Sequence, residues 1–224
     1  MMTFRHWIAF GMLALGVAAC SFTGQAPNRN AEIIVVGDSI LAWHRRSARS
    51  IPSVVAQSSG LTVSDVSISG APFLGPNGIP TQYVASDWDW VIVNGGGNDL
   101  YGTCQTPNGS RVLDALISSN GSQGAIPAFV NQAAAQGAQV IFLGYYPVRD
   151  RGGPFAACRA ILAELAARQA RLAASNPDVI FVDSGLVIAP GDASAYAVDL
   201  VHPSLRGAAL IGELVASVIA GNGR

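Results

Sequence analysis

The chain of 224 residues contains no lysine, because all 13 of its basic residues are arginine. Without lysine it cannot carry a Walker-type phosphate loop, a pyridoxal Schiff base or a serine–lysine nucleophile pair, since each needs that amine. Histidine is nearly as scarce, at three residues, and only 12% of the chain is charged. Half of the residues are hydrophobic, which is enough for a sizeable core and argues against disorder. The length predicts one domain.

The first twenty residues have the pattern of an export signal. A weakly basic start is followed by an apolar run from Trp7 to Ala19, too short at about 1.5 Å per residue to cross a hydrocarbon core of about 30 Å. Small residues then lead into Cys20, which resembles the lipobox of bacterial lipoproteins. We therefore expect residues 1–19 to be removed and Cys20 to be lipidated, anchoring the protein to a membrane of the bacterial envelope, facing the periplasm. Ordinary secretion with Cys20 unmodified is the alternative.

Removal of residues 1–19 changes the composition of the mature protein. It leaves His44 and His202 as the histidines and 12 of the 13 arginines against all 14 acidic residues. This near-neutral balance without a basic cluster gives no support for nucleic-acid binding. Cys104 and Cys158 would be the remaining unmodified thiols, and an even pair in an oxidising compartment predicts one disulfide. Two separately buried thiols are the alternative. We expect a monomer.

Residues 20–30 are expected to form a polar tether and residues 31–224 a single domain of alternating strands and helices. The predicted strands are the β-branched runs Glu32–Val36, Thr62–Ile68, Trp90–Val93, Gln139–Leu143 and Val179–Val182. The predicted helices are Ile40–Gln57, Pro127–Gln136, Phe155–Ala174 and Leu205–Ala220. Continuous apolar strands suit a parallel sheet buried on both faces. The fold class is therefore α/β, a three-layer α/β/α sandwich with a five-stranded parallel sheet in the order 2-1-3-4-5, and its sites should lie beyond the carboxyl ends of the strands.

The first predicted strand is followed by Gly37-Asp38-Ser39. Ser39 would sit at a helix start, where outward-pointing N–H groups and the helix dipole favour a developing negative charge. A nucleophilic serine needs such a place, although Asp38 or Ser39 acting only as a helix cap is the simpler interpretation.

A nucleophilic serine also needs a base. His44 lies five residues beyond Ser39, and on a continuous helix it would not reach back to the serine hydroxyl. His202 lies three residues after Asp199, close enough for the carboxylate to hold the second ring nitrogen. An ordinary helix start before Pro203 would explain the same residues.

Two further turns offer hydrogen-bond donors. Asn98 follows a run of three glycines after the third strand, and Gly70 follows the second strand. A side-chain amide and a bare backbone N–H are groups that can stabilise an oxyanion. Each segment taken alone is also an ordinary turn.

Taken together and in this order, these segments resemble the four sequence blocks of the GDSL/SGNH hydrolase superfamily. The matching segments are Gly37–Ser39, Gly70, Gly96–Asp99 and Asp199–Pro203. The resemblance implies Ser39 as nucleophile, His202 as base and Asp199 as its orienting partner. It also implies an oxyanion hole made of the N–H groups of Ser39 and Gly70 and the Asn98 side chain, with no cofactor and no metal.

The resulting functional prediction is a serine esterase that forms an acyl-enzyme with small or medium acyl esters. Alternatives are a catalytically weak glycan-binding module of the cell wall with the same fold, or an O-acetyl-sugar deacetylase. The sequence has no Gly-x-Ser-x-Gly nucleophile elbow, no His-Glu-x-x-His zinc motif and no Gly-x-Gly-x-x-Gly dinucleotide motif, which disfavours three other enzyme classes.

Overall fold

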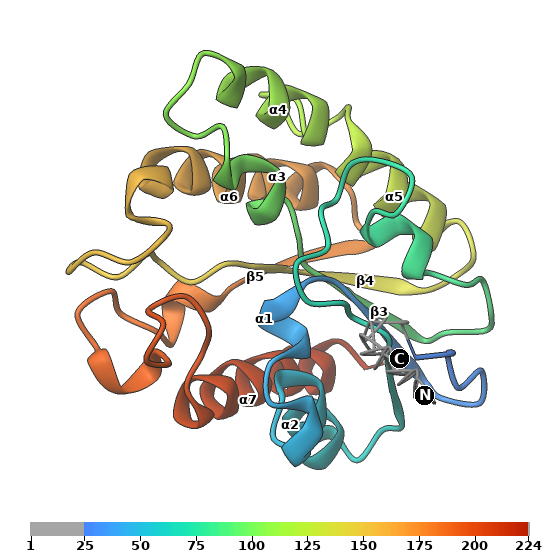
Figure 1. The fold of residues 1–224 in the computed structure, drawn as a ribbon. Coiled ribbons are helices and arrows are strands. Elements are labelled where there is room, and N and C mark those ends of the chain that lie inside the picture. Colours follow the sequence, from blue (N-terminus) through green and yellow to red (C-terminus); the bar gives the residue numbers. More distant parts are fainter. Residues whose placement is uncertain (1–24, 224) are drawn as a thin grey trace, which may run out of the picture.

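The computed structural model of the protein describes residues 25–223, which form three layers with a parallel sheet in the middle (Figure 1). The sheet has the strand order β2-β1-β3-β4-β5, and all of its neighbouring strands are parallel. This confirms the predicted fold class and strand order. The predicted signal sequence and Cys20 lie outside the described residues.

Each predicted strand run overlaps an observed strand, and β4 and β5 each extend one residue beyond the predicted run. The strands are β1 Ile33–Val36, β2 Val63–Asp65, β3 Trp90–Val93, β4 Gln139–Gly144 and β5 Val179–Asp183. Every residue of β1 and β3 is buried, and alternate side chains enter two separate cores. Ile34 and Val91 belong to one core, whereas Ile33 and Ile92 belong to the other. Burial on both faces explains why these strands are continuously apolar rather than alternating.

Helices cover both faces of the sheet (Figure 1). One face carries α3 Gly97–Tyr101, α4 Asn108–Leu116, α5 Ala125–Ala134 and α6 Arg159–Ser175, and the other carries α1 Ser39–Ala42, α2 Ile51–Ser59 and α7 Leu205–Asn222. Short 3₁₀ turns span Arg45–Ser47, Ile79–Gln82, Ala156–Cys158, Ser184–Leu186 and Ala193–Ala195. The crossovers bring the loops that follow the strands to one edge of the sheet.

The predicted helix over residues 40–57 is wrong, because the chain there forms α1, a 3₁₀ turn and α2. The helix α1 ends at the extended residue Trp43. His44 and Ala48 then adopt left-handed conformations, with φ of 64° and 53°, which redirect the chain. Ser50 then caps α2 by accepting a hydrogen bond from the Ser53 N–H, and Pro52 sits in the first turn. Proline is tolerated there but breaks a helix interior, so Pro52 marks a new start. The helices α3 and α4 were not predicted.

The C-terminal helix α7 is apolar and long enough to cross a membrane by length and composition. It packs against α2, and its buried face, including Ile211 and Val215, belongs to the core shared with β1 and β3. These contacts identify α7 as a core helix of the fold. A Cβ on Gly212 would overlap Val54 of α2, so this glycine permits the close approach of the two helices.

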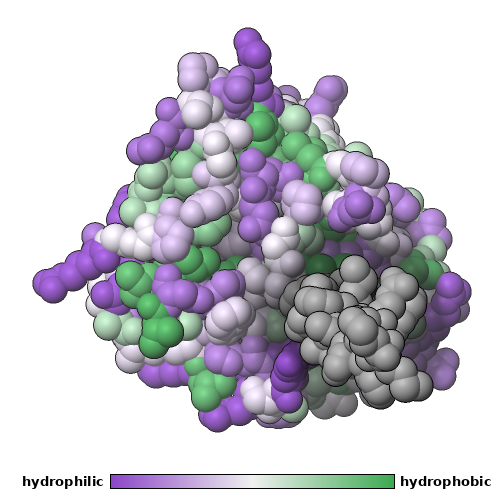
Figure 2. Space-filling model, in the orientation of Figure 1, coloured by the Kyte–Doolittle hydropathy of each residue, from purple (hydrophilic) through white to green (hydrophobic). Residues whose placement is uncertain are grey.

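On the surface drawn in Figure 2, hydrophobic residues lie in small groups among hydrophilic ones. The large hydrophobic side chains exposed in the described part of the chain are Tyr101, Leu186, Val198 and Leu205. They come from separate elements, and such scattered exposure is normal for a folded domain.

Candidate active site

A cavity of about 580 Å³ opens at the carboxyl edge of the sheet. The structure brings together there the five residues singled out by their positions after strands or before the last helix. Ser39, Gly70, Asn98, Asp199 and His202 all line this cavity. Other lining residues are mainly apolar or aromatic, among them Trp43, Tyr145, Tyr146, Phe155, Leu162 and Tyr196.

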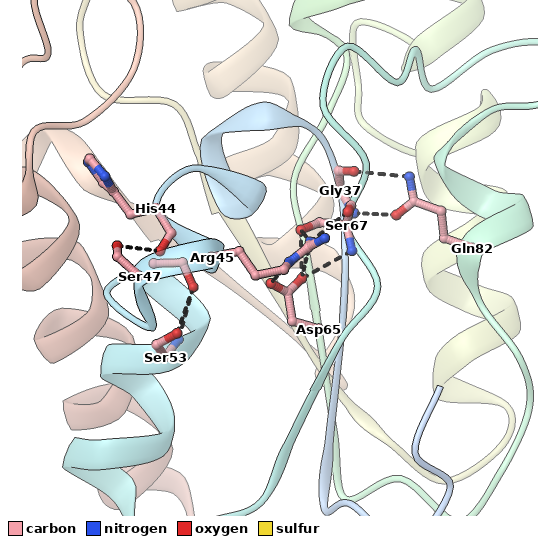
Figure 3. A network of polar contacts seen from close by, with 9 residues as sticks. Gly37, His44, Arg45, Ser47, Ser53, Asp65, Ser67 and Gln82 are labelled. Carbon is pink, nitrogen blue, oxygen red and sulfur yellow. Dashed lines mark hydrogen bonds and ion pairs between the residues drawn. The ribbon is translucent and has the colours of Figure 1, made fainter. Parts of the chain in front are cut away.

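The turn that carries Ser39 is held from three sides. Asp38 is the N-cap of α1, and its Oδ1 accepts a hydrogen bond of 2.9 Å from the Ile40 N–H. Asn94, at the end of β3, donates to Asp38 Oδ1 and accepts from the Asp38 N–H, at 2.9 and 3.1 Å. Gln82 makes a similar reciprocal pair with the backbone of Gly37, at 2.8 and 3.0 Å (Figure 3). These buried bonds fix the direction in which the chain enters α1.

Tyr145 connects the turn of Ser39 to the turn of Asn98. Its hydroxyl donates to Asp38 Oδ2 at 2.6 Å and accepts from the Gly97 N–H at 3.0 Å. Burial raises the pKa of Asp38, and hydrogen bonds led by the one from Tyr145 partly offset that rise. Burial, followed by the neighbouring Asp38 charge, raises the pKa of Tyr145 well above its ordinary value. The phenol therefore stays a hydrogen-bond donor at neutral pH. Neither Tyr145 nor this role of Asp38 was predicted, although Tyr145 does follow a strand end.

His202 and Asp199 form a close pair. The His202 Nδ1 lies 2.7 Å from Asp199 Oδ2, and Asp199 Oδ1 accepts from the N–H groups of Val201 and His202 at 3.0 Å each. Partial burial alone would raise the pKa of Asp199, but these hydrogen bonds outweigh burial and lower it. Leu200 has a φ of 61°, and this left-handed residue lets the short turn fold back on itself.

The other nitrogen of His202 makes no hydrogen bond to the described residues. Nε2 is buried and has no hydrogen-bond partner among the described residues, and no hydrogen bond links it to Ser39 Oγ. Trp43, which ends α1, stacks on the imidazole with ring centroids 3.8 Å apart and planes 6° apart. Catalytic hydrogen bonds of a serine–histidine pair are often open before substrate binds. Trp43 was not predicted as part of the site.

His44 occupies a different place from the one expected for a helical residue. Its Nε2 lies 3.0 Å from the backbone oxygen of Pro203, and Figure 3 shows its ring directed away from Gly37. The reason given from the sequence for setting His44 aside, a helical offset from Ser39, is therefore wrong. The contact with Pro203 instead joins the end of α1 to the segment that precedes α7.

Two of the predicted oxyanion donors, Gly70 in the loop after β2 and Asn98 in α3, lie on segments that are tied together. Gly70 has a φ of 77°, a left-handed conformation that suits glycine. Asn98 Nδ2 donates to the Ala71 backbone oxygen at 3.0 Å, which leaves the second hydrogen of that amide for another acceptor. The neighbouring Asp99 accepts from the N–H groups of Phe73 and Leu74, at 2.7 and 2.9 Å. Burial raises the pKa of Asp99.

An ion pair between Arg45 and Asp65 supports the segment that leads to Gly70. Arg45 Nε lies 2.7 Å from Asp65 Oδ2, at the end of β2, and Arg45 Nη2 donates to the Ser67 backbone oxygen at 2.6 Å (Figure 3). The Asp65 side chain is only 13% exposed, so this bidentate pair is better shielded than an ordinary surface bridge. It links the segment after Trp43 to the segment before Gly70.

Cys104 and Cys158 are joined by a disulfide, with their Cα atoms 5.1 Å apart. Cys104 follows α3, and Cys158 immediately precedes α6. The bond therefore ties the helix that carries Asn98 to the start of the helix that carries Leu162. Within residues 25–223, no group of three or more histidine, cysteine, aspartate or glutamate side chains could hold a metal ion.

Comparison with known proteins identifies the family. Residues 35–210 match the model of the GDSL-like lipase/acylhydrolase family. A protein from Slackia heliotrinireducens described as an SGNH hydrolase shares 22% identity and a TM-score of 0.62, covering 84% of this chain and 97% of its own. A member of the lipolytic G-D-S-L family from Veillonella parvula has 16% identity and a TM-score of 0.64, with coverages of 84% and 97%.

A carbohydrate acetylesterase from Sinorhizobium meliloti, Est24, has the same fold at a TM-score of 0.54 and 19% identity, covering 84% of this chain and 98% of its own. No curated protein matches the chain. The solved structures support the fold, and the family model spans most of the chain, from β1 into α7. The chain therefore belongs to the GDSL-like lipase/acylhydrolase family and is a serine ester hydrolase.

Proposed function

We propose that the protein hydrolyses small or medium acyl esters through an acyl-enzyme formed on Ser39. The observation that carries this proposal is the pair of Asp199 and His202 at 2.7 Å, in the same cavity as Ser39, with the second imidazole nitrogen buried and uncommitted. A carboxylate that holds Nδ1–H leaves Nε2 as the proton acceptor, which is the arrangement a serine nucleophile needs.

The proposed reaction has two halves. His202 Nε2 takes the proton of the Ser39 hydroxyl as its oxygen attacks the ester carbonyl, and the same nitrogen then gives that proton to the departing alcohol. His202 next takes a proton from water as the water oxygen attacks the acyl carbonyl. It returns that proton to the Ser39 oxygen as the acyl–serine bond breaks and the acid is released. The N–H groups of Ser39 and Gly70 and the Asn98 amide stabilise the oxyanion in both halves. Every step uses side-chain and backbone groups, without metal or organic cofactor.

A second candidate function, removal of acetyl groups from sugars, is suggested by the fold shared with the Sinorhizobium meliloti acetylesterase. The same triad would serve it. The largely apolar cavity walls argue for the first candidate, since a sugar requires hydrogen-bonding side chains around its hydroxyl groups. Comparison of p-nitrophenyl butyrate with an acetylated xylose separates the two candidates.

The proposal is tested by covalent labelling with a fluorophosphonate probe. We expect one label per protein, located on Ser39 by peptide mapping, with none on Ser39→Ala and full labelling of Ser119→Ala, which changes an exposed serine far along the chain. Absence of labelling in a folded wild-type protein that binds cell-wall glycans would instead favour the glycan-binding alternative.

We also propose that the protein is a lipoprotein of the bacterial envelope, anchored through Cys20 and facing the periplasm. The apolar run before Cys20 supports this proposal. Incorporation of labelled palmitate into the wild-type chain, and its loss in Cys20→Ala, is the expected result. Equal labelling of both chains would contradict the anchor.

A further inference from the structure

The loops after β2 and β4 contribute unequally to the cavity beside Ser39. The loop after β2 contributes only Ser69 and Gly70 to its lining, whereas the segment after β4 contributes a much longer wall. That wall consists of Tyr145, Tyr146, Pro147, Val148, Pro154 and Phe155. A substrate held at Ser39 therefore has room for a sizeable group on the β4 side.

The hydroxyl groups of the three tyrosines that line this cavity are all hydrogen-bonded within the protein. The Tyr145 hydroxyl is bonded to Asp38. The Tyr146 hydroxyl donates to the Val201 backbone oxygen, and the Tyr196 hydroxyl donates to the Pro147 backbone oxygen, at 2.6 Å each. Because these hydroxyls already have partners, the group that fits against them is apolar.

The walls on the two sides of the sheet serve different parts of an ester. Leu162 of α6 packs with the core on the α3–α6 face, whereas Tyr146 and Tyr196 belong to the core on the α7 face, from which the segment of His202 enters. His202 must reach the oxygen of the leaving alcohol, so the alcohol lies on the α7 side. The acyl substituent then points to the other side of the cavity, where Phe155 and Leu162 lie. We call these two residues the acyl wall. This step rests on the proposed function of Ser39 and His202.

The acyl wall is held in place by three contacts. Phe155 packs against Tyr101 at the end of α3, with ring centroids 4.7 Å apart. Three residues later, the disulfide fixes Cys158 to Cys104. Arg159 donates to the backbone oxygen of Val148 at 3.0 Å, which holds the incoming end of the same segment. Two independent contacts thus join the wall to the helix that carries Asn98.

We propose that Phe155 and Leu162 form the acyl-chain site of this enzyme, positioned by the Cys104–Cys158 disulfide, and that its substrates are esters of unbranched apolar acids longer than acetate. A methylene moved from water into such a site is worth about a fourfold gain in kcat/KM. The preference for longer acyl chains should therefore increase with each added methylene until the chain fills the site.

The test measures kcat/KM of the full-length chain for p-nitrophenyl acetate, butyrate, hexanoate and octanoate. We expect a rise of about fourfold per methylene at first. Leu162→Trp fills the site and should cut the hexanoate-to-acetate ratio by about tenfold or more. Leu162→Ala enlarges the site and should move the optimum to longer chains. The matched control Leu186→Ala, at a side chain that is 75% exposed, should keep the wild-type profile.

A second series, of acetate esters with alcohols of increasing length, separates the acyl wall from an alcohol site. Opposite shifts of Leu162→Trp and Leu162→Ala in the acyl series alone support the proposal. Shifts confined to the alcohol series, or a wild-type preference for acetate, would overturn it while leaving Ser39-dependent hydrolysis intact. Absence of hydrolysis of every ester would instead overturn the proposed function.

The positioning role of the disulfide has its own variant. Cys104→Ser/Cys158→Ser should flatten the acyl-chain profile, lowering the hexanoate-to-acetate ratio by about threefold or more, because a loosened wall loses contacts with the chain. The ratio is taken on protein that remains folded by circular dichroism at the assay temperature. An unchanged ratio would show that the wall keeps its place without the bond.

Discussion

Trp43 lies face to face with His202, with ring centroids 3.8 Å apart and planes tilted by only 6°. Trp43 is the C-cap of α1 and lies four positions after Ser39 along the chain. The contact joins it to the imidazole that we propose as the base. The stacked indole restricts rotation of the imidazole about its side-chain bonds while Asp199 holds the ring edge. We infer that Trp43 is a positioning residue.

Replacement of Trp43 should therefore lower kcat. Aromatic pairs are worth about 0.5–1.5 kcal/mol beyond the area that they bury, so Trp43→Leu should reduce kcat about two- to tenfold, and Trp43→Phe should restore most of it. Stopped-flow or steady-state hydrolysis of p-nitrophenyl butyrate gives the value. In a His202→Ala background, Trp43→Leu should cause no further loss; an equal loss there would mean that Trp43 does not act through the imidazole.

Removal of the Tyr145 hydroxyl should weaken the link between the turns of Ser39 and Asn98. A hydrogen bond to a charged group contributes about 1.5–3 kcal/mol, so Tyr145→Phe should lower the free energy of unfolding by about that amount. It should also raise the pKa of Asp38, because the Tyr145 bond is the largest of the effects that lower it. Urea unfolding, with exposed Tyr101→Phe as the control, measures the first effect. Equal stabilities of the two variants would contradict the bridging role.

Loss of the proposed oxyanion donor should act on turnover rather than on binding. Asn98→Ala should reduce kcat by about 10²–10³-fold, with a smaller change in KM, because the oxyanion exists in the transition state and not in the bound ester. Asn108→Ala, at an exposed position on α4, serves as the matched control. A kcat within threefold of wild type for Asn98→Ala would remove this residue from the proposed oxyanion hole.

The pair of Asp199 and His202 should leave a trace in the pH dependence of stability. Hydrogen bonds from His202 and the backbone lower the pKa of Asp199 below its ordinary value of 3.8. The folded state thus favours the carboxylate, which stabilises the protein above pH 3.8 and ceases to do so as the pH falls through the lowered pKa. The difference in Tm between wild type and Asp199→Asn should therefore shrink from pH 5 toward pH 2. A constant difference over that range would contradict the assignment.

The parallel sheet was predictable because its central strands β1 and β3 are buried on both faces. Ile33 and Val91 face opposite cores but are equally inaccessible to solvent. A continuous apolar run of this length predicts a strand buried on both faces, whereas an amphipathic helix has apolar residues on one face. The break after α1 was missed because His44 and Ala48 are ordinary residues in left-handed conformations, for which local sequence carries no mark. Pro52, by contrast, was an available signal of a new helix start.

The residues of the candidate site could be gathered from the sequence because a parallel sheet collects the loops after its strands at one edge. Ser39, Gly70 and Asn98 each follow a strand, and the structure places all three on one cavity. The position of a residue after a strand does not predict the contacts that Trp43 and Tyr145 make. Tyr145 meets Asp38 across 107 positions of the chain, and a bond of that kind depends on the packing of the whole fold.

The central claim is that Ser39 is the nucleophile of an ester hydrolase, and its most direct test is the turnover of p-nitrophenyl butyrate by Ser39→Ala. Loss of a nucleophile that acts together with its base costs about 10⁶-fold in kcat in well-studied serine hydrolases. We predict that Ser39→Ala shows no turnover above the buffer rate, while the control Ser119→Ala equals wild type. Undiminished hydrolysis by folded Ser39→Ala would contradict the account.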